Sequence, residues 1–581
     1  MWAGAKAAFV GAASLAAMQA NAEITTSGPL TQVDPWGVGW LGGADGALPS
    51  TLWDGASAIR LEDLMAQIDV SALSPASADL LRRTLLSSGR GPTGADAALI
   101  LGRLSLLHAL GEGEKAIDLK LRFTGKDWAS DGLAERVDRD LAAGRLSEAC
   151  AEADAFNEED AFWLKLRALC FAAAGELAAA ELTLEVARSS GIEDAWIRAA
   201  LKSVDAPNDP KPVADYSSGL HAEASIFADL EPADNSMDFV APDIAAMIAT
   251  RADIGEDLRV SAAFNAALAG KLPAKTARDI LIRPTPALEE DAPALTRTAL
   301  EQATDLFEDP LLDVEAKAAG LAGVLDVEGQ SFAAFRLAST LLTSELVQIA
   351  PSPETTPYAE VFARAALVSG DLDRARAWRG AMDPPPPPEP EPVELIDISL
   401  ETDDQGAIDL LPTATDEMLL DEVEPQAAPE PAFVFPEWTK ARIDALLVIA
   451  GAEIGDAAAK DAALRLTAHM DGETEAETAR VLHIYSALGK AMPSEAREIL
   501  ARADSDVGRA IGYGDVAAIQ SAAAAGVLGE AALASLVAMG GDPAAAEAGG
   551  LGMVLSILAS AGFEDDARAL AMEALSPQFG L

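Results

Sequence analysis

The chain contains two cysteines, Cys150 and Cys170, whose spacing bears on the chemistry open to it. They fall on adjacent predicted helices, on either side of a turn near residues 157–159. Both side chains can therefore stand at a similar height on an antiparallel hairpin. In an oxidising compartment this geometry allows a disulfide bond. The alternative is two separate buried thiols, because cysteine packs as a small apolar side chain. A redox-active pair is not indicated, since the sequence has no Cys-x-x-Cys.

The chain also contains four histidines, the side chains that most often bind metals or move protons: His108, His221, His469 and His483. No two lie within four residues of each other, and no His-Glu-x-x-His occurs, so no local zinc site is predicted. The sequence also lacks a phosphate-binding glycine loop, a Gly-x-Ser-x-Gly elbow and an EF-hand ligand series. Carboxylates are abundant, but nothing singles out a catalytic pair. We therefore predict no enzyme activity, no cofactor, and no catalytic or metal-binding residue.

Both cysteines lie in a region where helix-like apolar runs recur with a period of about 34 residues. Three glycines each end such a run: Gly111, Gly144 and Gly175. An alanine follows each glycine five residues later: Ala116, Ala149 and Ala180. Glycine can adopt the left-handed conformation that ends a helix, and alanine lets the next helix pack closely. This period indicates an array of helical hairpins, which bind partners and rarely perform chemistry.

The hairpin around Gly175 carries the most extended version of this pattern. Leu184 and Ala187 follow Ala180 on the same helical face, and Phe171 lies four residues before the glycine. This region resembles the tetratricopeptide repeat (TPR). The resemblance implies an α-solenoid, in which stacked hairpins present a groove to a protein or peptide.

Composition and charge restrict the class of protein further. Half of the 581 residues are hydrophobic, but only 5% are aromatic. Much of the apolar content is alanine, the best helix former, and alternating β-branched runs are almost absent, so the predicted fold is all-α. The net charge is −51, from 93 acidic and 42 basic residues. This balance excludes nucleic-acid binding, which needs clustered Lys and Arg, and disfavours anionic lipid surfaces.

The first 22 residues have the pattern of an export signal. Lys6 precedes an apolar stretch over residues 7–18, and Ala20 and Ala22 fit a small-x-small cleavage site. No later segment is apolar over 18 residues, so we expect a periplasmic protein without an integral membrane segment after signal removal. As a whole, the chain resembles exported helical-repeat proteins of alphaproteobacteria that have no assigned function. That resemblance rests on the signal, on Leu52-Trp53, and on the hairpin containing Cys150, Trp163 and Cys170.

Composition shifts divide the chain into segments. Residues 384–388 are an unbroken proline run, and residues 383–430 contain 15 acidic residues and no Lys or Arg, which predicts disorder. Two apolar patches there, 395–398 and 418–420, bind either a partner or this protein's own helices. The predicted organisation is a signal peptide (1–22), an extended Gly/Trp-rich arm (23–56), TPR-like repeats (57–203), an irregular linker (204–243), a second helical-repeat block (244–382), an acidic Pro-rich linker (383–435) and a C-terminal helical domain (436–581).

The function favoured by these patterns is a non-enzymatic periplasmic scaffold or adaptor. It would bind protein or peptide partners of the cell envelope through its repeats, in a setting such as an envelope or flagellar assembly. One alternative is an α/α-type periplasmic enzyme acting on cell-wall glycan, which a closed toroid with a central acidic pocket would favour. Another is an acidic periplasmic chaperone for basic clients.

Overall fold

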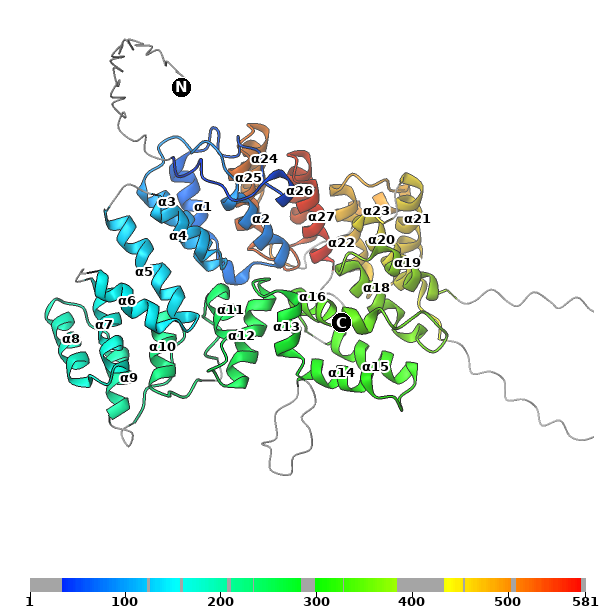
Figure 1. Ribbon diagram of the computed structural model, residues 1–581. Coiled ribbons are helices and arrows are strands. Elements are labelled where there is room, and N and C mark those ends of the chain that lie inside the picture. The colour runs from blue at the N-terminus through cyan, green and yellow to red at the C-terminus, as the bar shows by residue number, and fades with distance from the viewer. Residues whose placement is uncertain are drawn as a thin grey trace, which may run out of the picture.

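The computed structural model shows an all-α protein (Figure 1). The predicted signal segment, with Ala20 and Ala22, lies outside the described residues, as does nearly all of the acidic linker and both of its apolar patches. Within the described part, the regular elements are 27 α-helices and three short 3-10 helices, with no strand. The structure describes residues 34–575 except 123–125, 157–159, 206–209, 234, 284–297, 328, 384–432, 453–454 and 503–507.

The helices are short, and many follow one another through brief turns. The first ten are α1 (Ala58–Gln67), α2 (Pro75–Leu86), α3 (Ala97–Ala109), α4 (Gly113–Leu121), α5 (Lys126–Ala142), α6 (Leu146–Ala155), α7 (Ala161–Ala173), α8 (Leu177–Ser189), α9 (Ala195–Asp205) and α10 (Gly219–Phe227). The next nine are α11 (Pro242–Ala249), α12 (Glu256–Leu268), α13 (Ala274–Leu281), α14 (Ala299–Glu308), α15 (Val314–Leu325), α16 (Phe332–Leu341), α17 (Thr343–Leu346), α18 (Ala359–Val368) and α19 (Leu372–Ala381).

The last eight helices follow the acidic linker: α20 (Glu437–Ala450), α21 (Asp456–His469), α22 (Glu475–Ala487), α23 (Ser494–Arg502), α24 (Tyr513–Ala524), α25 (Leu528–Met539), α26 (Ala548–Ser560) and α27 (Glu564–Ala574). The 3-10 helices are η1 (Gly43–Asp45), η2 (Val70–Ala72) and η3 (Thr356–Tyr358). Among the described helices, none combines the length and apolar character needed to span a membrane.

Several helical hairpins share one kind of turn. At Gly175, between α7 and α8, the glycine has a φ of +80°. Its N–H donates to the carbonyl of Ala172, and the N–H of Glu176 donates to the carbonyl of Phe171. This pair of bonds is the Schellman arrangement, which needs a left-handed residue and so favours glycine. The same two bonds recur at ten other glycines with positive φ in the described residues: Gly111, Gly144, Gly191, Gly270, Gly370, Gly451, Gly489, Gly526, Gly540 and Gly562.

The alanines that follow these glycines lie at helix contacts. Ala116, Ala149 and Ala180 are almost completely buried, as are Leu184 and Ala187 on α8. A methyl side chain allows two helix backbones to approach closely, which accounts for alanine at the start of the second helix in each hairpin. Phe171 is only partly buried and packs at the edge of the apolar cluster that contains Ala149 and Ala180.

The buried apolar side chains form three clusters. One joins α5–α10, with Val137, Trp163 and Leu220 among its members. A second extends from the end of α5 and α9 to α16. The third and largest joins the N-terminal arm and α1–α4 to α14–α27. The segments at the two ends of the described chain therefore share one core.

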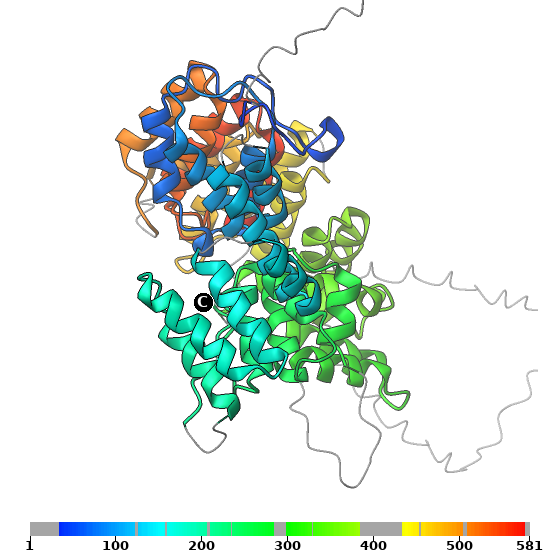
Figure 2. The same cartoon turned by 60° about the vertical axis from the view of Figure 1, so that its left-hand side comes forward.

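Packing of the C-terminal helices against the N-terminal helices brings these ends together. Helices α1 and α2 lie beside α25 and α27, which both views show (Figures 1 and 2). The N–H of Gly529 donates to the carbonyl of Leu52 at 2.8 Å, and the N–H of Ser74 donates to the carbonyl of Gly541 at 2.9 Å. Trp53 is fully buried and packs so closely on Gly529 that no side chain fits there.

Further contacts connect these helices to the rest of the fold. Helix α13 packs against α16, α16 against α18, α18 against α20, and α20 against α27. The turn between α3 and α4 contacts the α11–α13 region: Lys271 pairs with Glu112 at 2.7 Å, and Asp243 accepts from the N–H of Gly113 and pairs with Arg139. The helices therefore follow a closed circuit of contacts (Figure 1).

The described part of the predicted arm, residues 34–56, contains only η1 and packs against α2 and α3. Trp36 and Trp53 stack edge to face with ring centroids 5.2 Å apart. The buried guanidinium of Arg103 donates to the carbonyls of Pro35, Val38 and Leu85. Through these bonds Arg103, a residue of α3, fixes both the arm and the end of α2 to α3.

Candidate interaction surface

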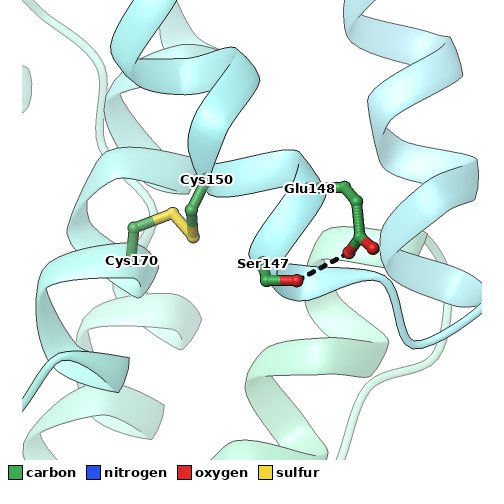
Figure 3. The surroundings of a disulfide bond; sticks show 4 residues. All are labelled: Ser147, Glu148, Cys150 and Cys170. Atoms are coloured by element: carbon green, nitrogen blue, oxygen red, sulfur yellow. Dashed lines mark hydrogen bonds between the residues drawn. A yellow bond between two sulfur atoms is a disulfide. The ribbon is translucent and has the colours of Figure 1, made fainter.

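The predicted hairpin of Cys150 and Cys170 is the α6–α7 pair. Their sulfur atoms are bonded, and their Cα atoms are 5.7 Å apart (Figure 3). Ser147 and Glu148, on the same helix as Cys150, form a hydrogen bond of 2.7 Å close to the disulfide. The bond closes a loop with a sequence separation of 20 residues. Both cysteines are half-buried, at the boundary between the core and the surface.

Trp163 supports this hairpin from the inside. It is completely buried, and its ring lies 4.7 Å from that of Phe156 and 5.3 Å from that of Phe162. Helix α7 begins after Asp160, whose carboxylate accepts from the N–H of Trp163. Aromatic contacts, a helix cap and a covalent link thus fix α6 and α7 relative to each other.

Helix α10 covers the face formed by the first helices of the successive hairpins. It packs against α5, α7 and α9. Its first two N–H groups, from Gly219 and Leu220, donate to the carboxylate of Asp138 on α5 at 2.9 and 2.7 Å. A Cβ at Gly219 would lie 1.6 Å from the backbone oxygen of Asp138, so only glycine allows this approach. Burial raises the pKa of Asp138 despite these two hydrogen bonds.

His221, also on α10, lies beside a serine and two aspartates, the residue types of a Ser-His-Asp catalytic site. Its Nδ1 is 2.9 Å from the carboxylate of Asp215 and 3.3 Å from the hydroxyl of Ser217. Its Nε2 is 3.3 Å from the carboxylate of Asp194. The ring also packs on Trp196, with centroids 4.9 Å apart.

His221 has carboxylates on both sides of its ring. A general base needs one ring nitrogen free to accept the proton of the serine hydroxyl. Here Nδ1, the nitrogen near the Ser217 hydroxyl, also faces Asp215, and Nε2 faces Asp194. Burial raises the pKa of Asp194, but hydrogen bonds from the N–H of Ile197 and from Lys165 outweigh it and place that pKa below its ordinary value. The cluster therefore links α7, α9 and α10 electrostatically.

An apolar surface remains open in this region on the outer face of α8. Leu182 is 66% exposed and Val186 is 45% exposed. Ala178 is also exposed, and the three residues are spaced by four, so they form one stripe along the helix. Glu181 and Glu185 follow one edge of this stripe. We call the set of Ala178, Glu181, Leu182, Glu185 and Val186 the outer α8 face.

A pocket of about 320 Å³ lies elsewhere, between the ends of α24 and α26. It is lined by small or uncharged side chains: Gln520, Ala523, Ala524, Ser556, Ile557, Ser560 and Ala561. Such a lining contains no carboxylate pair, nucleophile or base. In the described part of the chain, no group of three or more His, Cys, Asp or Glu side chains is placed to hold a metal ion.

The sequence-predicted residues divide between two regions of the fold. Gly144, Ala149, both cysteines, Phe171, Gly175, Ala180, Leu184 and Ala187 lie together in the α5–α8 hairpins, whereas Gly111 and Ala116 belong to α3–α4. Sequence analysis did not identify Asp138, the His221 cluster or the outer α8 face. The spacing of Ala178, Leu182 and Val186 was available as a signal for the last of these. No protein-family model, curated protein or solved structure matches the chain significantly.

Proposed function

We propose that this chain is a non-enzymatic periplasmic scaffold or adaptor that binds protein or peptide partners of the cell envelope through TPR-like helical repeats. The observation that carries the proposal is the outer α8 face, an apolar stripe left exposed on a hairpin stack that is otherwise well packed. Scattered exposed apolar residues are ordinary, but aligned ones mark interaction sites. An envelope or flagellar assembly is a fitting setting.

The site of binding differs from the inner groove that the TPR resemblance implies. Helix α10 fills the face formed by α5, α7 and α9. The closed circuit of helices also differs from an open α-solenoid with two free ends. Both features favour the outer helices of the hairpins as the surface that binds partners.

The disulfide between Cys150 and Cys170 supports an exported location. Disulfide bonds form and persist in oxidising compartments and are rare in the reducing cytosol. Fusion of residues 1–40 to a phosphatase that is active only after export tests this point. We expect phosphatase activity in intact cells, and its absence would contradict the periplasmic assignment.

The two alternative functions make different demands on the structure. A glycan-cleaving enzyme needs a deep cleft with paired acids, and the pocket between α24 and α26 offers small neutral side chains instead. An acidic chaperone would bind basic clients over its whole surface, without dependence on one helix.

Binding is tested by affinity capture from envelope extracts with the full exported chain. The test variant carries Leu182→Gln and Val186→Gln on α8. The matched control carries Ile59→Gln on α1 and Leu464→Gln on α21, whose side chains are 73% and 43% exposed. We expect a partner that the wild type and the control retain and that the α8 variant loses. Equal recovery by all three proteins would contradict the proposal.

A further inference from the structure

We infer that the contact between α2 and α27 is a pH-sensitive switch, which is stable while Glu573 carries a proton and opens more readily when Glu573 is ionised. This inference goes beyond the proposed function and concerns how the closed circuit of helices is held together. It follows from the position of the contact, the surroundings of the Glu573 carboxyl group and the charges on the neighbouring helices.

The contact lies where the first and last parts of the described chain meet (Figures 1 and 2). The N–H of Ser74, just before α2, donates to the carbonyl of Gly541 at 2.9 Å. The N–H of Ala76, in the first turn of α2, donates to Oε1 of Glu573 on α27 at 2.7 Å. These bonds join α2 to the C-terminal helices, so a change at Glu573 acts directly on one link of the closed circuit.

The Glu573 carboxyl group is buried in this contact, with a side chain that is only 4% exposed. Its Oε2 atom has no hydrogen-bond partner, and no ion pair involves either of its oxygens, in the part of the chain that the structure describes. Ionisation in such surroundings removes the anion from water without supplying a cation in its place. The contact therefore favours the protonated carboxyl group.

The start of α2 and nearby charges act on ionised Glu573 in opposite directions. The N–H groups at the start of α2 carry a partial positive charge and favour the anion, as does Arg336 of α16. Asp542, in the turn between α25 and α26, disfavours the anion. Burial outweighs the favourable interactions and raises the pKa of Glu573 from 4.5 to about 7.

The other cations around α27 bind different groups. Arg480 of α22 donates to backbone carbonyls, including that of Ala574 next to Glu573. Arg442 of α20 pairs with Glu360 and Glu477. Neither guanidinium forms an ion pair with Glu573.

Asp566 is the second acid on the face of α27 that meets α2, two turns before Glu573. It differs from Glu573 in having a direct cation partner, Arg83 of α2, at 2.6 Å. Burial still raises the pKa of Asp566 despite this ion pair. Both acids therefore disfavour the contact when they are ionised, but only Glu573 lacks a cation to offset the effect.

The direction of the pH effect follows from the raised pKa of Glu573. When the contact opens, Glu573 meets water and regains its ordinary pKa, so opening releases a proton at neutral pH. Opening is therefore least favourable below a pH of about 4.5, and it becomes easier as the pH rises to about 7. The contact is expected to be most stable in acid and to open more often at neutral pH and above.

The test measures alkylation by iodoacetamide of a single thiol placed in the contact of the full exported chain. Ser77 on α2 is fully buried, and Ser77→Cys changes one atom there. Ser203→Cys on α9, also buried, is the reference outside the contact. Both native cysteines are in the disulfide, so only the introduced thiol reacts. Dividing each rate by that of the same thiol in the unfolded chain removes the pH dependence of the thiol itself.

Between about pH 5 and about pH 8, the corrected rate at Ser77→Cys should rise at least about thirtyfold more with Glu573 than with Glu573→Gln. Glu62→Gln, at an exposed position on α1, is the matched control and should leave this rise unchanged. The corrected rate at Ser203→Cys should change by less than about threefold in both backgrounds.

Equal rises with Glu573 and with Glu573→Gln would overturn the inference. A rise of the same size at Ser203→Cys would also overturn it, because the whole chain would then loosen with pH. Circular dichroism verifies that each variant retains its helices. If Ser77→Cys fails to fold, Ala78→Cys, half-buried in the same turn of α2, replaces it in the same comparison.

Discussion

Replacing Glu573 with Gln should remove a pH dependence from the contact between the two ends of the chain. Glu573 is a buried residue of α27, and its Oε1 accepts from the N–H of Ala76 in the first turn of α2 at 2.7 Å. Its Oε2 is buried without a hydrogen-bond partner among the described residues. Burial raises the pKa of Glu573 from 4.5 to about 7, although hydrogen bonds from Ser74 and Ala76 act in the opposite direction.

The sign of the effect follows from this raised pKa. The folded state disfavours the ionised carboxylate, so its stability is highest below a pH of about 4.5 and falls as the pH rises through about 7. A shift of this size corresponds to about 3 kcal/mol. The partial positive charge at the start of α2 stabilises the anion and offsets up to about 1 kcal/mol of that cost. We therefore expect a loss of about 2–3 kcal/mol across this pH range.

Hydrogen exchange of the peptide that contains the start of α2 is the assay, because it reports local opening of this contact. Rates corrected for intrinsic exchange give the free energy of opening at about pH 5 and about pH 8. In the wild type this free energy should fall by about 2–3 kcal/mol relative to Glu573→Gln, which keeps the acceptor for Ala76 and remains neutral. Glu62→Gln, at an exposed position on α1, is the matched control and should follow the wild type. Parallel pH profiles for the wild type and Glu573→Gln would refute the reasoning.

Three further predictions concern the hairpins and the helix that covers them. Replacing Cys150 and Cys170 with Ser should destabilise the α6–α7 region by about 3 kcal/mol in hydrogen exchange, as expected for closure of a loop of this length; unchanged protection would contradict this role. Gly175→Ala should lower the free energy of unfolding by about 1–2 kcal/mol, because space is available for the methyl group and only the left-handed backbone is strained. Gly219→Ala should lower the free energy of unfolding by about 3 kcal/mol or more, since its Cβ would overlap the backbone of Asp138. Urea unfolding measures both losses, and a smaller loss for Gly219→Ala than for Gly175→Ala would be inconsistent with the placement of α10.

Local signals allowed the helical class and individual hairpins to be predicted. The all-α fold follows from composition, and it is confirmed for the described residues. A glycine such as Gly175 marks a helix end through its own backbone, and an alanine such as Ala180 marks a close contact through its own size. Both effects act within a few residues, so a single sequence displays them.

Contacts between distant parts of the chain could not be predicted in this way. Arg83 pairs with Asp566 at 2.6 Å across a separation of 483 residues, and neither side chain differs in type from dozens of others. Helix α10 lies inside the segment 204–243, where five prolines amid polar residues (Pro207, Pro210, Pro212, Pro232 and Pro242) indicated an irregular linker. Helix α10 has only nine residues, and its start is held by Asp138 of α5. So short a segment carries too little local signal to be recognised as a helix that packs over its neighbours.

Photo-crosslinking at position 182 in living cells tests the central claim most directly, with position 59 as the reference. Both side chains are exposed and apolar, but only Leu182 belongs to the outer α8 face. We predict an adduct with an envelope protein at position 182 and little or none at position 59. Absence of an adduct at position 182, or equal adducts at both positions, would contradict a protein that acts by docking partners on this face.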